Sequence, residues 1–209
     1  MIIVQKFKQM FKKKKPKFFL KDTMAEEIKK GLFTCGKWSY GNPKIYRWSN
    51  NSKIHIGNFC SMGPEVSIYV DPDHRLDNIT TSPLSEKNFF DKFTKASNDF
   101  VFERGDLNIG HDVWIGGHVV IFSGINIGTG AIIGAGSVIR KNVDPYSIVY
   151  GNPAKEIGKR FNDNLIAKLL KSQWWNLNDN AINEISNDLL SDDAEALLKK
   201  IEKLKNEHK

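Results

Sequence analysis

The sequence of 209 residues predicts a mainly β protein, a parallel β-helix followed by an α-helical segment. Three observations lead to this prediction. An isoleucine recurs every sixth residue from Ile109 to Ile139, and glycine follows it at four of the six places. The fourth residue after each isoleucine is small or β-branched. This period fits neither the 3.6-residue period of a helix nor the strict alternation of a hairpin sheet, and it indicates a repeat architecture.

Each six-residue unit is expected to form one short strand and one corner of a three-sided coil. The isoleucine points inward and stacks on its equivalent one coil later, about 18 residues along the chain. Glycine relieves crowding where the chain turns, and the small residue fills the corner. The same frame appears upstream at Ile56, Met62 and Ile68, so we expect this domain to span residues 36–160.

Two segments depart from the period. Residues 69–108 lose it, and a long excursion from a rigid scaffold usually carries function. After residue 160 the pattern becomes helical, with Asn162 and Asp163 as predicted caps of a first helix and a second amphipathic stretch over 192–207. We expect these helices, residues 161–209, to form a lid over the open end of the β-helix.

Residues 1–35 form a basic arm, because eight lysines fall within the first 21 residues among several phenylalanines. Such an arm suits peripheral contact with an anionic membrane surface, at about 1 kcal/mol per basic residue. It equally suits a solvated tail that keeps the protein soluble. The formal charge of +7 comes mostly from this arm, so no nucleic-acid partner is predicted.

The composition bounds the protein class. With 40% hydrophobic and 26% charged residues, the chain is not expected to be disordered. No apolar run approaches the roughly 18 residues of a membrane-spanning helix, and the N-terminus does not resemble a secretory signal. Two cysteines without CxxC spacing predict a reduced, cytoplasmic protein. If the arm binds lipid, the protein would lie at the inner face of the membrane.

Four segments together resemble one family of enzymes: IGNFCSMGPEVSI from residue 56, DHRLDNITTSP from 73, the repeats over 109–139, and YGNPAKEIGKRF from 150 followed by QWWN. They are similar to hexapeptide-repeat acyltransferases, in the xenobiotic branch of type-B chloramphenicol and streptogramin acetyltransferases. The resemblance implies left-handed coils, acetyl-CoA as co-substrate without a metal, and a homotrimer whose active sites lie between subunits.

His74 is the predicted catalytic residue. It lies in the excursion among charged residues, so it is not expected to fill the core. Attack of a hydroxyl on a thioester needs a base, and an imidazole with a pKa near 6.5 suits that role at neutral pH. The family carries its catalytic base in the matching segment. The alternative is a loop histidine in ordinary polar contacts.

A second group of residues is predicted to bind the coenzyme. Trp114 points outward beside Gly116 and Gly117, where an indole and backbone amides suit a pantetheine arm; subunit packing is the alternative. One coil later the groove would continue, and a basic rim near the end of the repeat would meet the phosphates. The remaining candidates are Ala135, Gly136, Ser137, Lys141, Pro153, Lys155 and Arg160.

Other polar residues receive weaker assignments. Asp77, Thr80 and Thr81 are candidates for hydrogen bonds to a hydroxylated acceptor. Cys60 falls at a small corner position and is predicted to be core. The histidines at 55, 111 and 118 are expected on outer faces, and their spacing does not match the zinc ligands of carbonic-anhydrase-like relatives, so no metal is predicted.

The predicted reaction is transfer of acetyl from acetyl-CoA to a hydroxyl in a ternary complex, with His74 as base. A sugar of a surface polysaccharide or its precursor is the favoured acceptor, because the basic arm suits work near a membrane. Chloramphenicol or a streptogramin antibiotic is the alternative, followed by a sugar amine. A zinc hydratase or a non-enzymatic scaffold would lack affinity for coenzyme A.

Overall fold

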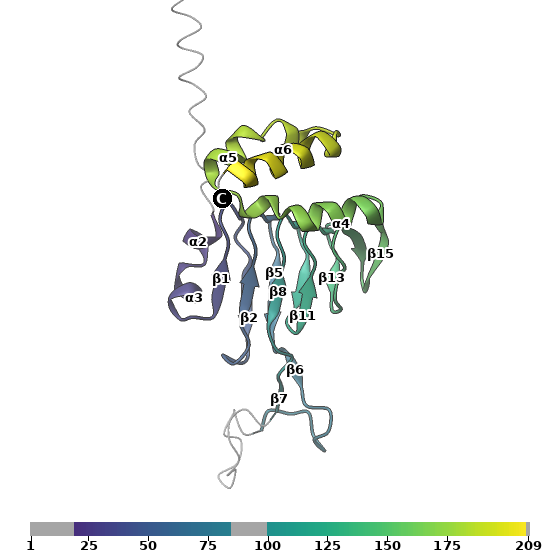
Figure 1. The fold of residues 1–209 in the computed structure, drawn as a ribbon. Coiled ribbons are helices and arrows are strands. Elements are labelled where there is room, and N and C mark those ends of the chain that lie inside the picture. The colour runs from purple at the N-terminus through teal and green to yellow at the C-terminus, as the bar shows by residue number, and fades with distance from the viewer. Residues whose placement is uncertain (1–18, 85–99, 208–209) are drawn as a thin grey trace, which may run out of the picture.

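The computed structural model describes residues 19–84 and 100–207, and its centre is a three-sided prism of short, mostly parallel strands (Figure 1). Sheet A holds β4 (Ser61–Met62), β9 (Trp114–Ile115), β12 (Ile132–Ile133), β14 (Ser147–Gly151) and β15 (Ala154–Lys159). Sheet B holds β1 (Phe33–Cys35), β3 (Ile54–Ile56), β8 (Leu107–Ile109) and β11 (Ile125–Ile127). Sheet C holds β2 (Lys44–Arg47), β5 (Ser67–Val70), β10 (Val120–Phe122) and β13 (Val138–Ile139).

Successive coils pair in register along each side of the prism. Ile56, Ile109 and Ile127 align in sheet B, and Ile121 aligns with Ile139 in sheet C. These side chains are buried in one continuous core. The predicted inward stacking of the isoleucines is therefore confirmed, because only stacking on the next coil removes them from water.

The chain passes from sheet B to sheet A to sheet C within each coil, which defines three edges of the prism. The B–A edge holds residues 57–60, 110–113 and 128–131. The A–C edge holds residues 63–66, 116–119 and 134–137. The C–B edge holds the excursion, which leaves after β5 and returns at β8, together with residues 140–142.

Two short helices close the N-terminal end of the prism. They are α2 (Leu20–Thr23) and α3 (Ala25–Lys29), and they bury Leu20 and Met24 in the prism core. The first strand of the prism, β1, precedes residue 36, where the sequence analysis placed its start. Residues 1–18, which carry most of the basic arm, lie outside the described residues.

The C-terminal segment begins with α4 (Asp163–Ser172), and Asn162 is its N-cap as predicted, since its Oδ1 accepts from Leu165 N at 2.9 Å. It continues through η1 (Trp174–Asn176), α5 (Asp179–Glu184), η2 (Asp188–Leu190) and α6 (Ala194–Glu207). None of the helices in the described ranges is long and apolar enough to cross a membrane.

The expected lid over the open end is wrong. Helix α4 runs back along the prism toward β1, with α5 and α6 beyond it (Figure 1). Along the B–A edge, Trp174 packs against Phe59 and Trp175 stacks on His111. The C-terminal segment lies along the B–A edge because Phe59 and His111 there pack against its two tryptophans. At the C-terminal end of the prism, β15 instead pairs antiparallel with β14.

Candidate active site

A hairpin of two short strands projects from the C–B edge and carries the predicted base. Strand β6 (Asp73–His74) pairs antiparallel with β7 (Val101–Phe102), with His74 opposite Val101. Figure 1 shows both strands beyond the body of the prism, on the side away from α4–α6. The hairpin is therefore presented by the scaffold and does not belong to its packed core.

The His74 ring is held from two sides. Its Nδ1 lies 2.5 Å from the carbonyl oxygen of Thr81, and the ring forms a T-shaped pair with Phe100 at a centroid distance of 5.3 Å. A carbonyl oxygen can only accept, so Nδ1 carries the hydrogen of this bond, and in the neutral ring Nε2 keeps its lone pair. Arg75 N donates to Phe100 O at 2.7 Å, which fixes the strand next to the ring. This arrangement suits a general base.

The three predicted acceptor-binding residues lie in the same exposed turn as His74. Thr81 contributes its carbonyl to the histidine. Thr80 Oγ1 accepts from Ser82 N, which stabilises the turn. Asp77 pairs with Arg75, with 3.0 Å between Nε and Oδ1, and the hydrogen bonds from this guanidinium lower the pKa of the carboxyl. The structure thus gathers these residues, with the Asp77 carboxylate already engaged.

Most of the predicted coenzyme-binding residues meet at the A–C edge. Trp114 is 57% exposed on sheet A, and Gly117 follows it at the edge. Ala135 and Gly136 are exposed one coil later, and Ser137 Oγ accepts from Gly151 N at 3.1 Å. That bond holds the β14–β15 turn next to the A–C edge. The turn contains Pro153, which follows a cis peptide bond.

Backbone groups at this edge are open to a ligand. Among the described residues, the N–H groups of Gly117 and Ala135 donate to no backbone carbonyl. A Cβ at Gly136 would meet no atom within 4 Å, so the backbone there is open to a ligand. Gly116 differs, because it is buried against Ala135 and serves the stacking of coils.

The basic candidates are not gathered with this group. Arg160 binds Asp112 at 3.1 Å and the carbonyl of Gly130 at 2.9 Å on the B–A edge, beneath the start of α4. Burial raises the pKa of Asp112, while Arg160 opposes that rise. Lys141 lies at the C–B edge, and Lys155 is exposed on β15. Among the residues that the structure describes, Arg160 therefore lies apart from Lys141 and Lys155.

The remaining histidines and Cys60 have structural surroundings. His55 is partly exposed between Thr34 and Asp106. His118 is exposed at the A–C edge. His111 does not lie on an outer face as expected, because Trp175 covers it, and burial lowers its pKa. Cys60 is fully buried as predicted, and burial raises the pKa of its thiol to about 11.

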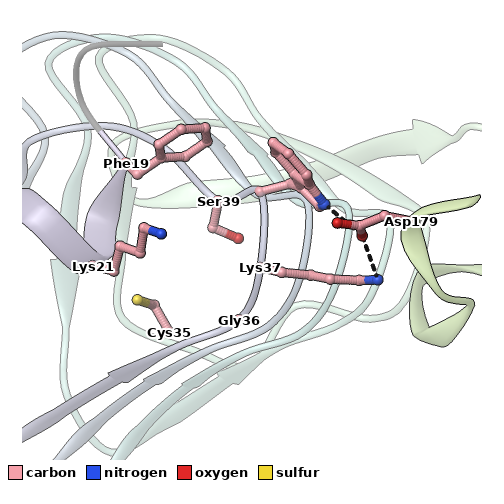
Figure 2. Close-up of a pocket in the computed structure, with 8 residues that line it drawn as sticks. Phe19, Lys21, Cys35, Gly36, Lys37, Ser39 and Asp179 are labelled. Carbon is pink, nitrogen blue, oxygen red and sulfur yellow. Dashed lines mark hydrogen bonds and ion pairs between the residues drawn. The ribbon is translucent and has the colours of Figure 1, made fainter. Parts of the chain in front are cut away.

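A separate cavity of about 330 Å³ lies where the first coil meets α5 (Figure 2). Asp179 joins the two, accepting from Trp38 Nε1 at 3.0 Å and from Lys37 Nζ at 3.1 Å. These hydrogen bonds lower the pKa of Asp179. The thiol of Cys35 and the ammonium of Lys21 face the same space (Figure 2). This cavity lies between the prism and the C-terminal helices, whereas His74 projects from the C–B edge, so the two are separate sites.

The residues that hold the hairpin left no signal in the sequence. Asp73 binds Arg104 Nε at 2.5 Å and Arg140 at 3.3 Å, and Phe100 packs on His74. Phe100 and Arg104 flank β7 in the segment that returns to the prism, far from His74 in the sequence and without a periodic signal. The acidic neighbours of His74 were visible in the sequence, but their partners were not.

Comparison with known proteins assigns the family. The chain is 36% identical over 167 residues to a chloramphenicol acetyltransferase of Agrobacterium fabrum, covering 73% of this chain and 79% of that protein. The chain belongs to the hexapeptide-repeat acetyltransferases, in their xenobiotic branch. This acetyltransferase is also 38% identical over 193 residues to a virginiamycin A acetyltransferase of Staphylococcus aureus, covering 87% and 86% of the two chains. A probable macrolide acetyltransferase of Lysinibacillus sphaericus is 46% identical over 129 residues, 59% of this chain and 69% of that protein.

A comparison with models of protein families finds no match. A solved hexapeptide-repeat acetyltransferase of Vibrio cholerae, in complex with acetyl-CoA, is similar with a TM-score of 0.48 and 25% identity. The similarity covers 63% of this chain and 62% of that one, less than two thirds of its length. The fold of this acetyltransferase is a three-sided β-helix of short, mostly parallel strands.

Proposed function

We propose that this acetyltransferase moves the acetyl group of acetyl-CoA to a hydroxyl of an antibiotic-like small molecule, with His74 as general base. The observation that carries the proposal is the hydrogen bond from His74 Nδ1 to Thr81 O, which leaves Nε2 free to accept a proton. The ring lies at the surface of a projecting hairpin, where an acceptor can reach it.

The proposed reaction is a direct transfer. Nε2 removes the proton of the acceptor hydroxyl as its oxygen attacks the thioester carbonyl carbon. The carbon–sulfur bond then breaks, and the imidazolium returns the proton to the sulfur of coenzyme A. Thr81 O stabilises the charged ring during the step, because it keeps the Nδ1 hydrogen bond. Cys60 is buried, with a raised thiol pKa, so a direct transfer is favoured over an acetyl-cysteine.

The proposal keeps two classes of acceptor, an antibiotic and a polysaccharide sugar, and the names of the relatives favour the antibiotic. The three relatives above are named for chloramphenicol, virginiamycin A and macrolides, which favours an antibiotic hydroxyl. The sequence analysis placed a polysaccharide sugar first because of the basic arm, most of which lies outside the described residues. A screen that measures thiol release with chloramphenicol, streptogramins, macrolides, oligosaccharides and nucleotide sugars separates the two.

The role of His74 is tested by His74→Ala with the best acceptor of that screen. We expect kcat to fall at least 100-fold, since a positioned base contributes about 10²–10⁴ in rate. The dissociation constant of acetyl-CoA should stay unchanged. His55→Ala is the matched control, because His55 is a partly exposed histidine on sheet B with its own partners. A His74→Ala enzyme with normal turnover would overturn the assignment.

We propose further that one active site uses two chains of a homotrimer. Trp114 lies on sheet A, whereas the His74 hairpin leaves the prism at the C–B edge, opposite that sheet. Within one chain the prism therefore separates the base from the exposed indole. Leu76 and Ile79 on the same excursion are almost fully exposed, and burial against a neighbouring subunit would remove them from water.

Complementation tests this arrangement. Mixing equal amounts of His74→Ala and Trp114→Ala chains during assembly should give trimers in which about a quarter of the interfaces carry both intact residues. At acetyl-CoA concentrations well below the dissociation constant, we expect about that fraction of wild-type activity, more than the roughly tenfold-reduced activity of Trp114→Ala alone. Light scattering should give the mass of three chains. A monomer, or a mixture no more active than Trp114→Ala alone, would contradict the two-chain site.

A further inference from the structure

Two carboxylates tie the neck of the excursion to the prism. Asp71 is fully buried, and its Oδ1 accepts from Arg104 N at 2.7 Å and from Ser123 Oγ at 3.2 Å. Asp73, two residues later, binds the side chain of the same arginine at 2.5 Å. Arg104 is thus held by its backbone and by its guanidinium, and it lies between β7 and β8, in the segment that returns to the prism.

The second partner of Asp73 comes from the last coils. Arg140 lies 3.3 Å from Asp73 Oδ1, and its guanidinium lies 4.1 Å from the centroid of the Phe122 ring. Phe122 stacks on Tyr69, and Tyr69 on Tyr46, along the outer face of sheet C. The cation is therefore packed on a row of rings that belongs to the rigid prism.

The location of Asp73 separates it from the chemistry itself. Asp73 and His74 are consecutive residues of strand β6, so their side chains point to opposite faces of the hairpin. The carboxylate faces the arginines of the prism, whereas the imidazole faces Phe100 and Thr81. The Asp73–Arg104 pair is only 31% and 20% exposed, so it is more strongly coupled than a surface pair.

We infer that Asp73 is a positioning residue for acetyl transfer: its bonds to Arg104 and Arg140 fix the hairpin so that the His74 imidazole is held at the reacting hydroxyl. This inference rests on the proposed role of His74. A small displacement of a catalytic base is costly because proton transfer requires hydrogen-bond contact with the acceptor. The link acts on the orientation of the base and leaves the A–C edge, where acetyl-CoA is proposed to bind, unchanged.

The test compares Asp73→Asn, Asp73→Glu and Arg104→Lys in the full-length enzyme. Asparagine keeps the shape of Asp73 but loses its charge. We expect kcat to fall about tenfold, as for a base displaced by a fraction of an ångström, with the KM for acetyl-CoA changed less than twofold. The two variants that keep both charges should recover part of kcat. Glu195→Gln is the control, because it removes an exposed pair with Lys168 between α4 and α6.

Hydrogen–deuterium exchange supplies a readout that does not depend on His74. In Asp73→Asn, the amides of residues 73–76 should exchange faster while those of β8–β11 stay as in the wild type. Faster exchange with unchanged kcat, or no recovery in the charge-keeping variants, would overturn the positioning role. Faster exchange together with an active His74→Ala enzyme would instead refute the proposed base. Equal exchange in wild type and Asp73→Asn would show that the bonds of Asp73 to Arg104 and Arg140 do not hold the hairpin.

Discussion

The stacking of coils requires a residue without a side chain at Gly57, and substitution of this residue tests that requirement. A Cβ built at Gly57 would lie 2.4 Å from Gly110 O and 2.8 Å from His111 N, both on the next coil. Ordinary contact begins near 3.4 Å, so Gly57→Ala requires the coils to separate locally by about 1 Å. The bond from Gly57 N to Ile109 O, 2.8 Å long, would lengthen with them.

Overpacking of this kind typically costs about 1–3 kcal/mol, and the upper value is expected here because backbone atoms cannot rotate away. At roughly 2–4 °C per kcal/mol for a chain of this size, Tm should fall by roughly 6–12 °C in Gly57→Ala. Circular dichroism during heating measures the change. Because His74 lies on another edge, kcat at 25 °C should stay near the wild-type value.

Gly158→Ala is the matched control, since a Cβ at Gly158 would meet no atom within 4 Å. Its Tm should change by about 1–2 °C at most, as for other surface substitutions. If Gly57→Ala were as stable as Gly158→Ala, the close approach of the coils at this edge would be refuted.

Three further outcomes are expected. Trp114→Ala should weaken acetyl-CoA binding about tenfold, close to 1.4 kcal/mol, in a calorimetric titration; an unchanged dissociation constant would exclude the indole from the coenzyme site. Burial lowers the pKa of His111, so below its unfolded pKa of about 6.5 the unfolded chain binds more protons than the folded protein. The contribution of His111 to the free energy of unfolding is therefore full above about pH 6.5 and decreases as the pH falls below it. Urea unfolding at pH 7 and 5 should therefore show a smaller loss in His111→Gln than in the wild type. Iodoacetamide at pH 8 should label partly exposed Cys35 well before buried Cys60, whose thiol has a pKa of about 11. Mass spectrometry measures the order of labelling, and earlier labelling of Cys60 would contradict its burial.

The six-residue repeat predicts most of the β-helix, because the burial of its isoleucines requires the coils to stack. An isoleucine at every sixth position is buried only if the coils stack, and the observed alignment of Ile109 with Ile127 follows from that. The cap at Asn162 was equally predictable, because capping depends on a side chain three residues from the amide that it accepts from. Contacts that are local or periodic leave a signature in the order of residues.

The position of the C-terminal helices left no such signature. Their apolar faces at Leu169 and Ile201 required a partner but did not specify which one. The B–A edge provides it, because Phe59 and His111 meet the two tryptophans there. The expected lid failed because amphipathicity reports that a face is buried and not what covers it.

The amino-acid order alone determined the three-sided coil and the interruption of the repeat that carries His74, the proposed base. The tertiary structure decided that His74 Nδ1 faces the Thr81 carbonyl, which residues fix the hairpin, and that Arg160 binds Asp112 and the Gly130 carbonyl. Those features depend on Thr81, Arg104 and Asp112, side chains and carbonyls that reach their partners only after the chain has folded, because sequence distance between contacting atoms follows no period.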